Sequence, residues 1–420
     1  MPPLLPAKHH IYLRKSLKQL IVRIIKREEN AALKFNFDIE INRGEVPALK
    51  VHSLVLGENS SDLFAAGVAD MDFQVAPQII DALQTRVAHG VFGYEAMPSD
   101  LLPALTGWLA TRHRWLVDQS HILRAPNVLN SLAIAVSLFS DEGDGIILQP
   151  PVFFDFFDII REGKQKTVEN PLILKNGRYE MDFEGLEELT SNPQNKILFL
   201  CNPHNPVGRV WTKQELTKLG EICARNDVLV VSDELHGDLT FPNHNYTPFS
   251  SLGADYEQNS ITFLSPAKTF NIAGCCCSFT IVANEARRNA FQTENSRLTV
   301  NKNNAFSSVA MVAAYQNSES WLDSMLDYLH GNLVLVRKRL GELPQVDLIE
   351  PEGTFLLWLD FRKLNKSPDE LTEFLRADAG WAITRGIAFG KQGAGFARLN
   401  IACPRDILSG ALDKLEKALG

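Results

Sequence analysis

Short apolar runs constrain the fold of this chain more than any other feature of its sequence. They cover residues 145–148, 197–201, 228–232 and 261–264. None of them alternates between apolar and polar residues, which is typical of strands covered on both faces of a parallel sheet. A helical pattern at residues 213–226 lies between two of these runs. The sequence therefore predicts an α/β protein with a mostly parallel sheet.

The pattern changes after about residue 305. Before it, helical patterns cover residues 77–89, 101–113 and 129–139. After it come a long helical region at 307–340, strands at 354–360 and 396–401, and helices at 368–377 and 406–419. We therefore expect four parts: a basic extension at 1–33, a segment at 34–72 that contributes to the small domain, a large α/β domain at 73–305 and a small α+β domain at 306–420.

The first 27 residues are rich in Lys and Arg and contain no acidic residue. Their apolar residues fall at helical spacing, which is typical of a basic amphipathic helix. Such a helix suits organelle targeting or a membrane surface. The alternative, which we favour, is an appended extension that packs loosely on the body of a cytoplasmic protein.

Composition excludes several classes of partner. The net charge of -8 disfavours a nucleic-acid-binding protein, which needs a basic surface, and is compatible with small-molecule substrates. No apolar run reaches the ~18 residues that a membrane-spanning helix requires. The six cysteines include no CxxC pair, so we expect buried thiols in a reducing compartment and no metal site.

Polar residues follow three of the apolar runs. Asn202 and Asp233 each come directly after a run, and Lys268 comes four residues after a third. The separations are 31 residues from Asn202 to Asp233 and 35 from Asp233 to Lys268, and each suits one crossover unit of ~30 residues. Ligands of open α/β sheets bind outside the carboxyl ends of the strands. We therefore expect an amide, a carboxylate and an amine along one sheet edge.

This set suits pyridoxal phosphate (PLP), whose chemistry needs a lysine to hold the aldehyde as an imine and an acid beside the pyridine nitrogen. Lys268 and Asp233 fit these roles, and Asp233 would keep the nitrogen protonated so that the ring accepts electrons from Cα. The amide of Asn202 can bind the 3-oxygen of the ring, and His236 can lie over the same edge. Each residue alone is weak support, because a single Asp after a strand usually caps a turn or helix.

The segments around these residues resemble PLP enzymes of the class I and II aminotransferase fold, known as fold type I. They are most similar to the cystathionine β-lyase, or C–S lyase, branch. The resemblance covers about residues 34–420 and is carried by residues 68–73, 202–211, 232–236, 265–274 and 396–404.

The resemblance implies roles for further residues. Arg398 would grip the α-carboxylate of an amino-acid substrate, which suits its bidentate fork. Tyr94 would reach across a homodimer interface toward the cofactor phosphate of the partner's site and act in catalysis there.

The resemblance also implies a phosphate cup and a stacking ring. The helix that opens at Val128 and Leu129 would bind the phosphate through backbone N–H groups, and the hydroxyl of Ser265 would add to them. Phe153 stands where the family usually has a tyrosine, so it can stack on the pyridine ring but lacks the hydroxyl.

We expect a lyase that releases a thiol, pyruvate and ammonia from cystathionine or another S-substituted L-cysteine. Two alternatives stay open. An aminotransferase would use the same residues and would need a 2-oxo acid as acceptor, and a regulatory protein would bind PLP without turnover.

Overall fold

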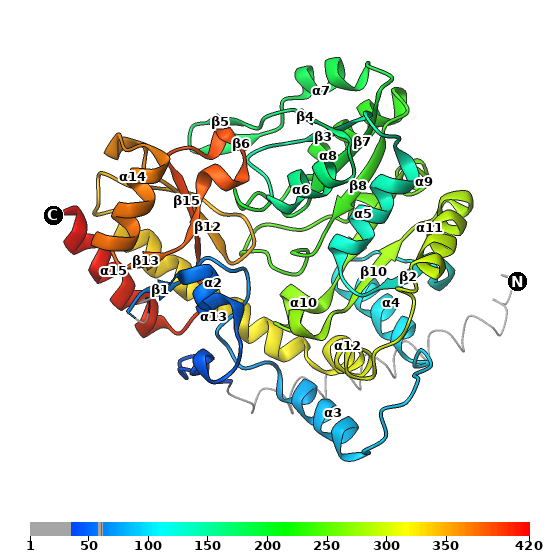
Figure 1. Cartoon of the computed structure of the whole chain (residues 1–420), viewed down its shortest axis with the longest axis horizontal. Coiled ribbons are helices and arrows are strands. Elements are labelled where there is room, and N and C mark those ends of the chain that lie inside the picture. Colours follow the sequence, from blue (N-terminus) through cyan, green and yellow to red (C-terminus); the bar gives the residue numbers. More distant parts are fainter. Residues whose placement is uncertain (1–34, 58–59, 61) are drawn as a thin grey trace, which may run out of the picture.

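The structure is a computed structural model that describes residues 35–57, 60 and 62–420. The basic extension expected at residues 1–33 lies outside the described residues. Two sheets with flanking helices make up most of the described chain (Figure 1). No helix of the described part is long and apolar enough to span a membrane.

A seven-stranded sheet forms the centre of the larger part. Its strands lie in the order β2-β10-β9-β8-β7-β3-β4, and only β10 pairs with its neighbours in antiparallel direction. The expected α/β class with a mostly parallel sheet is confirmed. The strands are β2 (Ile122–Ala125), β3 (Gly145–Leu148), β4 (Lys166–Glu169), β7 (Asn195–Cys201), β8 (Leu229–Asp233), β9 (Ser260–Leu264) and β10 (Ser278–Ile281).

Both faces of this sheet are covered, which explains the uninterrupted apolar runs. Along β7, Ile197 and Phe199 belong to one buried cluster, and Leu198 and Leu200 belong to another on the opposite face. The helices of this part are α3 (Pro77–Ala88), α4 (Leu101–Arg112), α5 (Val128–Phe139), α6 (Asp155–Glu162), α7 (Phe183–Thr190), α8 (Lys213–Arg225), α9 (Ala254–Gln258), α10 (Pro266–Thr269) and α11 (Glu285–Arg297).

A smaller antiparallel sheet has the strand order β11-β12-β15-β14. The segment before α3 joins this part, because β1 pairs with β13 in parallel direction. The domain limits themselves stay a prediction. The elements are α2 (Ser53–Leu56), β1 (Phe64–Ala65), β11 (Asp347–Ile349), β12 (Leu356–Asp360), α14 (Pro368–Glu373), β13 (Trp381–Ala382), β14 (Thr384–Arg385), β15 (Phe396–Asn400) and α15 (Arg405–Leu419), and a separate hairpin pairs β5 (Ile173–Lys175) with β6 (Arg178–Glu180).

The long helical region expected at residues 307–340 is two helices, α12 (Ala305–Asn317) and α13 (Glu319–Leu340). The break falls at Ser318, which is fully buried and donates its hydroxyl to the carbonyl of Ala313. A serine side chain that bonds its own backbone competes with the helical ladder. Apolar residues continue at helical spacing on both sides, so the pattern alone predicts one helix.

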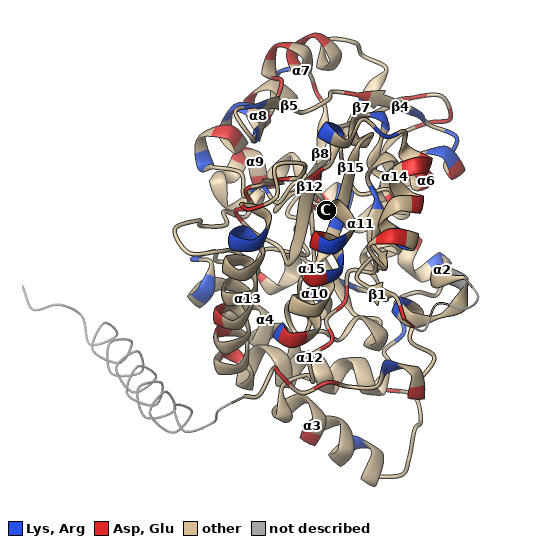
Figure 2. Cartoon of the chain, turned by 90° about the vertical axis from the view of Figure 1, so that its left-hand side faces the viewer, with Lys and Arg blue, Asp and Glu red and all other residues tan. Residues whose placement is uncertain are grey.

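Positions of Lys and Arg and positions of Asp and Glu are interspersed along the ribbon of the described chain (Figure 2). This distribution agrees with the net charge of -8.

Two glycine substitutions, one beside the smaller sheet and one in α4, test the packing. A Cβ on Gly386 would lie 2.2 Å from the carbonyl oxygen of Gly393 and 2.3 Å from that of Phe396. We expect Gly386→Ala to lower the free energy of unfolding by about 1–3 kcal/mol or more. Gly107, inside α4, has open space around its Cα, so Gly107→Ala should raise stability by about 0.5–1 kcal/mol. Denaturant unfolding measures both, and equal effects would contradict the packing described.

Candidate active site

The carboxyl ends of three neighbouring parallel strands form the base of the site. In the register of β7, β8 and β9, Cys201 lies opposite Asp233, and Asp233 lies opposite Phe263. The N–H of Asn202 donates to the carbonyl of Asp233 at 2.9 Å. Asn202 and Asp233 are therefore fixed side by side by the sheet itself, as the spacing in the sequence predicted.

Lys268 reaches the same edge from the short helix α10. Ser265 caps this helix, because its hydroxyl oxygen accepts from the N–H of Ala267 at 3.0 Å. The Lys268 amine donates to the carbonyl of Ala69 at 2.7 Å. Burial lowers the pKa of Lys268 and the Arg398 charge lowers it further, while Asp70, Asp233 and Asp155 act in the opposite direction.

Asp233 is a buried acid. Its side chain accepts from the N–H of Leu235 at 3.2 Å. Burial raises the pKa of Asp233 to about 6, although the Leu235 hydrogen bond and the Lys268 charge both lower it. A cationic partner inside the site would restore the ionised form, because opposite charges stabilise each other at close range.

Three buried polar atoms of the site have no hydrogen-bond partner among the described residues. They are Oδ1 of Asn202, Nδ1 of His236 and Nε of Arg398. Burial lowers the pKa of His236 to about 3, with smaller contributions from Lys268 and Arg398. Unpartnered buried polar atoms are uncommon in folded proteins. Their presence beside Lys268 and Asp233 fits a site that binds a polar ring, and the residues present therefore fit PLP.

Arg398 comes from β15 of the small sheet. Its guanidinium donates to Oδ1 of Asn205 at 3.0 Å, to the carbonyl of Gly67 at 2.7 Å and to the hydroxyl of Thr384 at 3.2 Å. It also lies over the ring of Phe389 at 4.9 Å. Burial lowers the pKa of Arg398 to about 9. Among the described residues no carboxylate pairs with it, so it is suited to bind one from a ligand.

The predicted phosphate cup would lie at the start of α5. Asn127 caps this helix by accepting from the N–H of Asn130, and Val128 and Leu129 form its first turn. The Ser265 hydroxyl donates to the carbonyl of Cys277 at 2.5 Å, so its proton is already used within the protein. Phe153 is half-buried and contacts the rings of Phe154 and Phe156.

Tyr94 is not brought to the site by its own chain. Its side chain is fully exposed, at 110% of the reference area. Several neighbours in the sequence are also exposed apolar residues, namely Val87, Val91, Phe92 and Met97. The catalytic and phosphate-binding roles of Tyr94 therefore need a second subunit and stay a prediction.

The sequence alone did not indicate some residues of the site. Gly67 and Ala69 act through backbone carbonyls, which leave no signal in a sequence. Glu234 is also buried, and it accepts hydrogen bonds from the Ser232 hydroxyl, the Tyr246 hydroxyl and the N–H of Phe249. Its position directly after Asp233 was the available signal, because two acids at the end of a buried strand are uncommon.

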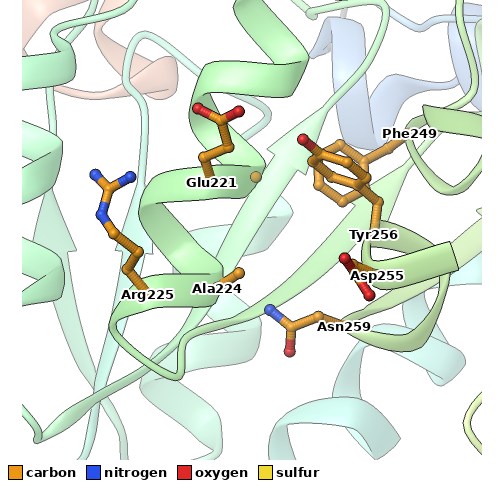
Figure 3. A pocket seen from close by; sticks show the side chains of 8 residues that line it. Glu221, Ala224, Arg225, Phe249, Asp255, Tyr256 and Asn259 are labelled. Atoms are coloured by element: carbon orange, nitrogen blue, oxygen red, sulfur yellow. The ribbon is translucent and has the colours of Figure 1, made fainter. Parts of the chain in front are cut away.

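A separate cavity of about 260 Å³ lies between α8 and α9 (Figure 3). Tyr256 and Phe249 line one side, and Glu221 and Arg225 lie on the helix opposite. The residues of this cavity precede β8 and β9, so it lies at the amino ends of these strands. It is therefore remote from the edge that carries Asp233.

Comparison with known proteins identifies the family. The sequence model of the family described as aminotransferase class I and II matches residues 64–415. The chain belongs to the class I and II aminotransferase family. The resemblance recognised in the sequence is confirmed, including its C–S lyase branch, since relatives in this family carry the name cystathionine beta-lyase.

Three members of the family are similar to this chain over most of its length. Cystathionine beta-lyase PatB of Bacillus subtilis (strain 168) is 38% identical over 360 residues, which cover 86% of this chain and 93% of PatB. Protein MalY of Escherichia coli (strain K12) is 33% identical and covers 86% of this chain and 90% of MalY. The structure of cystalysin from Treponema denticola, which contains PLP, has a TM-score of 0.89 at 33% identity and covers 92% of this chain and 99% of cystalysin.

The buried side chain of His204 makes the free energy of unfolding depend on pH. Burial lowers the pKa of His204 to about 4, below its value of roughly 6.5 in an unfolded chain. The unfolded chain therefore binds a proton first as the pH falls, and stability decreases from about pH 7 to about pH 4. We expect His204→Gln to flatten this slope, and the exposed His89→Gln to leave it unchanged. Denaturant unfolding across this range checks both, and equal slopes would contradict the assignment.

Proposed function

We propose that this protein is a PLP-dependent carbon–sulfur β-lyase. It would cleave cystathionine or a related S-substituted L-cysteine into a thiol, pyruvate and ammonia. The observation that carries the proposal is the meeting of Lys268, Asp233 and the unpaired Arg398 at one sheet edge. The similarity to cystathionine beta-lyase PatB, at 38% identity, supports the lyase activity within the family.

PLP is the cofactor of this family, and when bound it supplies an aldehyde that joins an amine and a ring that accepts electrons from Cα. The buried Asp233 would bind the ring nitrogen, and Lys268 the aldehyde. Asn202 and His236 would lie at the 3-oxygen edge: Oδ1 of Asn202 and Nδ1 of His236 have no partner among the described residues, while Nδ2 of Asn202 donates to the carbonyl of Thr247. The ring of Phe153 would stack on the pyridine ring. At the phosphate, the first turn of α5 would contribute Val128 and Leu129, and the cap of α10 would contribute Ser265.

The chain's own groups account for substrate binding and for one proton transfer. Arg398 would bind the α-carboxylate through two parallel N–H donors. Lys268, once its amine is free, would take the proton from Cα as a general base. The lowered pKa of Lys268, caused by burial and by Arg398, favours the neutral amine that this step needs. The electron pair left at Cα would form a Cα–Cβ double bond as the Cβ–S bond breaks, and the sulfur would leave as a thiolate.

An aminotransferase would use the same residues and is the second candidate. The two activities differ in where the Cα proton goes, because a transaminase returns it to the cofactor and needs a 2-oxo acid. The name of the relative cystathionine beta-lyase PatB favours the lyase. A binding protein without turnover is the third candidate, and the buried base at Lys268 disfavours it.

The exposed apolar segment around Tyr94 supports a homodimer as part of this proposal. Exposed apolar surface of this kind marks sites of protein association. A second copy would cover Val91 and Phe92 and would place Tyr94 beside the partner's cofactor phosphate. We also infer that the protein acts in the cytoplasm on small amino acids.

One assay separates the three candidates. The purified protein is incubated with cystathionine without any oxo acid, and pyruvate and thiol are measured. A lyase releases both, a transaminase is active only after an oxo acid is added, and a binding protein does neither. We expect release of both products and a loss to background in Lys268→Ala, since the base at Cα is gone. Lys363→Ala, at an exposed ion pair with Asp347, is the matched control and should keep full activity.

Mixed dimers test the role of Tyr94. We expect Tyr94→Ala and Lys268→Ala each to be inactive alone. If Tyr94 serves the partner's site, half of the randomly mixed dimers regain one intact site of two, so the activity returns to about a quarter. If Tyr94 served its own site, no mixed dimer would have an intact site. Activity after mixing and refolding distinguishes the two outcomes.

A further inference from the structure

The segment between β1 and α3 contacts both cations of the site. We call residues 67–72 the strap. The carbonyl of Gly67 accepts from Arg398 at 2.7 Å, and the carbonyl of Ala69 accepts from Lys268 at 2.7 Å. Asn400 donates to the carbonyls of Val68 and Asp70 and holds the strap against β15. The strap therefore supplies a hydrogen-bond acceptor to each of the two cations.

The strap also carries two carboxylates, and both are held by cations from the segment before it. Arg43 donates to Asp70 at 2.6 Å and to Asp72 at 2.8 Å. Lys50 donates to Asp72 at 2.7 Å and is only 2% exposed. The charges of the four groups cancel. Burial alone would lower the pKa of Arg43, but its hydrogen bonds and ion pairs with Asp70 and Asp72 raise it.

Asp70 is the carboxylate of the strap that comes next to the site. Asp70 follows Ala69 directly, and its charge already acts on Lys268. Arg398 is buried without a carboxylate partner among the described residues, and a buried guanidinium favours any acid that can reach it. A carboxylate on the same chain would compete at a high effective concentration with one in solution.

We propose that Arg43 and Lys50 are positioning residues that hold Asp70 and Asp72 in internal ion pairs and so keep Arg398 free for the α-carboxylate of the substrate. The identity of that ligand as an amino acid rests on the proposed function. The four charged groups act through the strap and touch neither the substrate nor the cofactor. They set the affinity for the carboxylate group rather than the rate of the chemical step.

A charge-rescue experiment on the holoenzyme tests the proposal. We expect Arg43→Gln to raise the KM for cystathionine about tenfold with kcat within about twofold, because binding of the carboxylate is weakened equally in the ground state and the transition state. Asp70→Asn in the same chain removes the freed carboxylate and should return KM to within about threefold of the wild type. Arg337→Gln, which breaks an exposed ion pair with Glu350, is the control and should change neither value.

A binding measurement separates this inference from the proposed function. Calorimetry on the holoenzyme should show weaker binding of L-alanine to Arg43→Gln, recovery in the double variant, and no change for ethylamine, which lacks the carboxylate. If the wild type released no thiol but alanine binding followed this pattern, the lyase assignment would fail and the inference would stand.

A merely structural role for Arg43 gives a different result. In that case the double variant would bind alanine no better than Arg43→Gln, and this outcome overturns the proposal. An unchanged KM and an unchanged alanine affinity in Arg43→Gln overturn it as well. If Arg43→Gln does not fold, Asp70→Asn alone decides, since the proposal predicts unchanged or tighter alanine binding and a structural role predicts weaker binding.

Discussion

The carboxylate of Asp233 lies buried at the end of β8, between two strands that are covered on both faces. A charge in such a place is unfavourable unless other groups pair with it. The N–H of Leu235 donates to this carboxylate, and α10 brings the charge of Lys268 to the same edge, while the parallel register fixes Asn202 beside the Asp233 backbone. The chemistry of the site follows from this one burial, since a carboxylate without solvent interacts strongly with a cationic ring and with a nearby amine.

The smaller sheet adds the group that this edge lacks, through β15. Arg398 is held by carbonyl, amide and hydroxyl oxygens and has no acid beside it among the described residues. Its guanidinium is therefore oriented before a substrate arrives and keeps its charge uncompensated. The strap joins the two parts, as its carbonyls bind Arg398 and Lys268 while its carboxylates face Arg43 and Lys50. The two residues proposed for cofactor binding and carboxylate recognition, Lys268 and Arg398, therefore both contact the same short segment.

The sheet and the polar strand ends could be predicted from the sequence, because a run such as 197–201 without alternation is typical of a strand buried on both faces. Arg398, Tyr94 and Phe153 could be found only through the resemblance to a family, since nothing in their spacing marks them. Gly67 and Ala69 could not be found, because every residue has a carbonyl. The break at Ser318 was missed because apolar periodicity continues on both sides, and a single buried hydroxyl decides it.

The central claim is that Lys268 is the residue that carries the cofactor. Borohydride reduction of the purified protein, followed by peptide mapping with mass spectrometry, tests this directly. The account predicts that the reduced cofactor is attached to the peptide that contains Lys268. Attachment to the buried Lys50 or to any other lysine, or a protein purified with PLP that shows no covalent attachment after reduction, would contradict it.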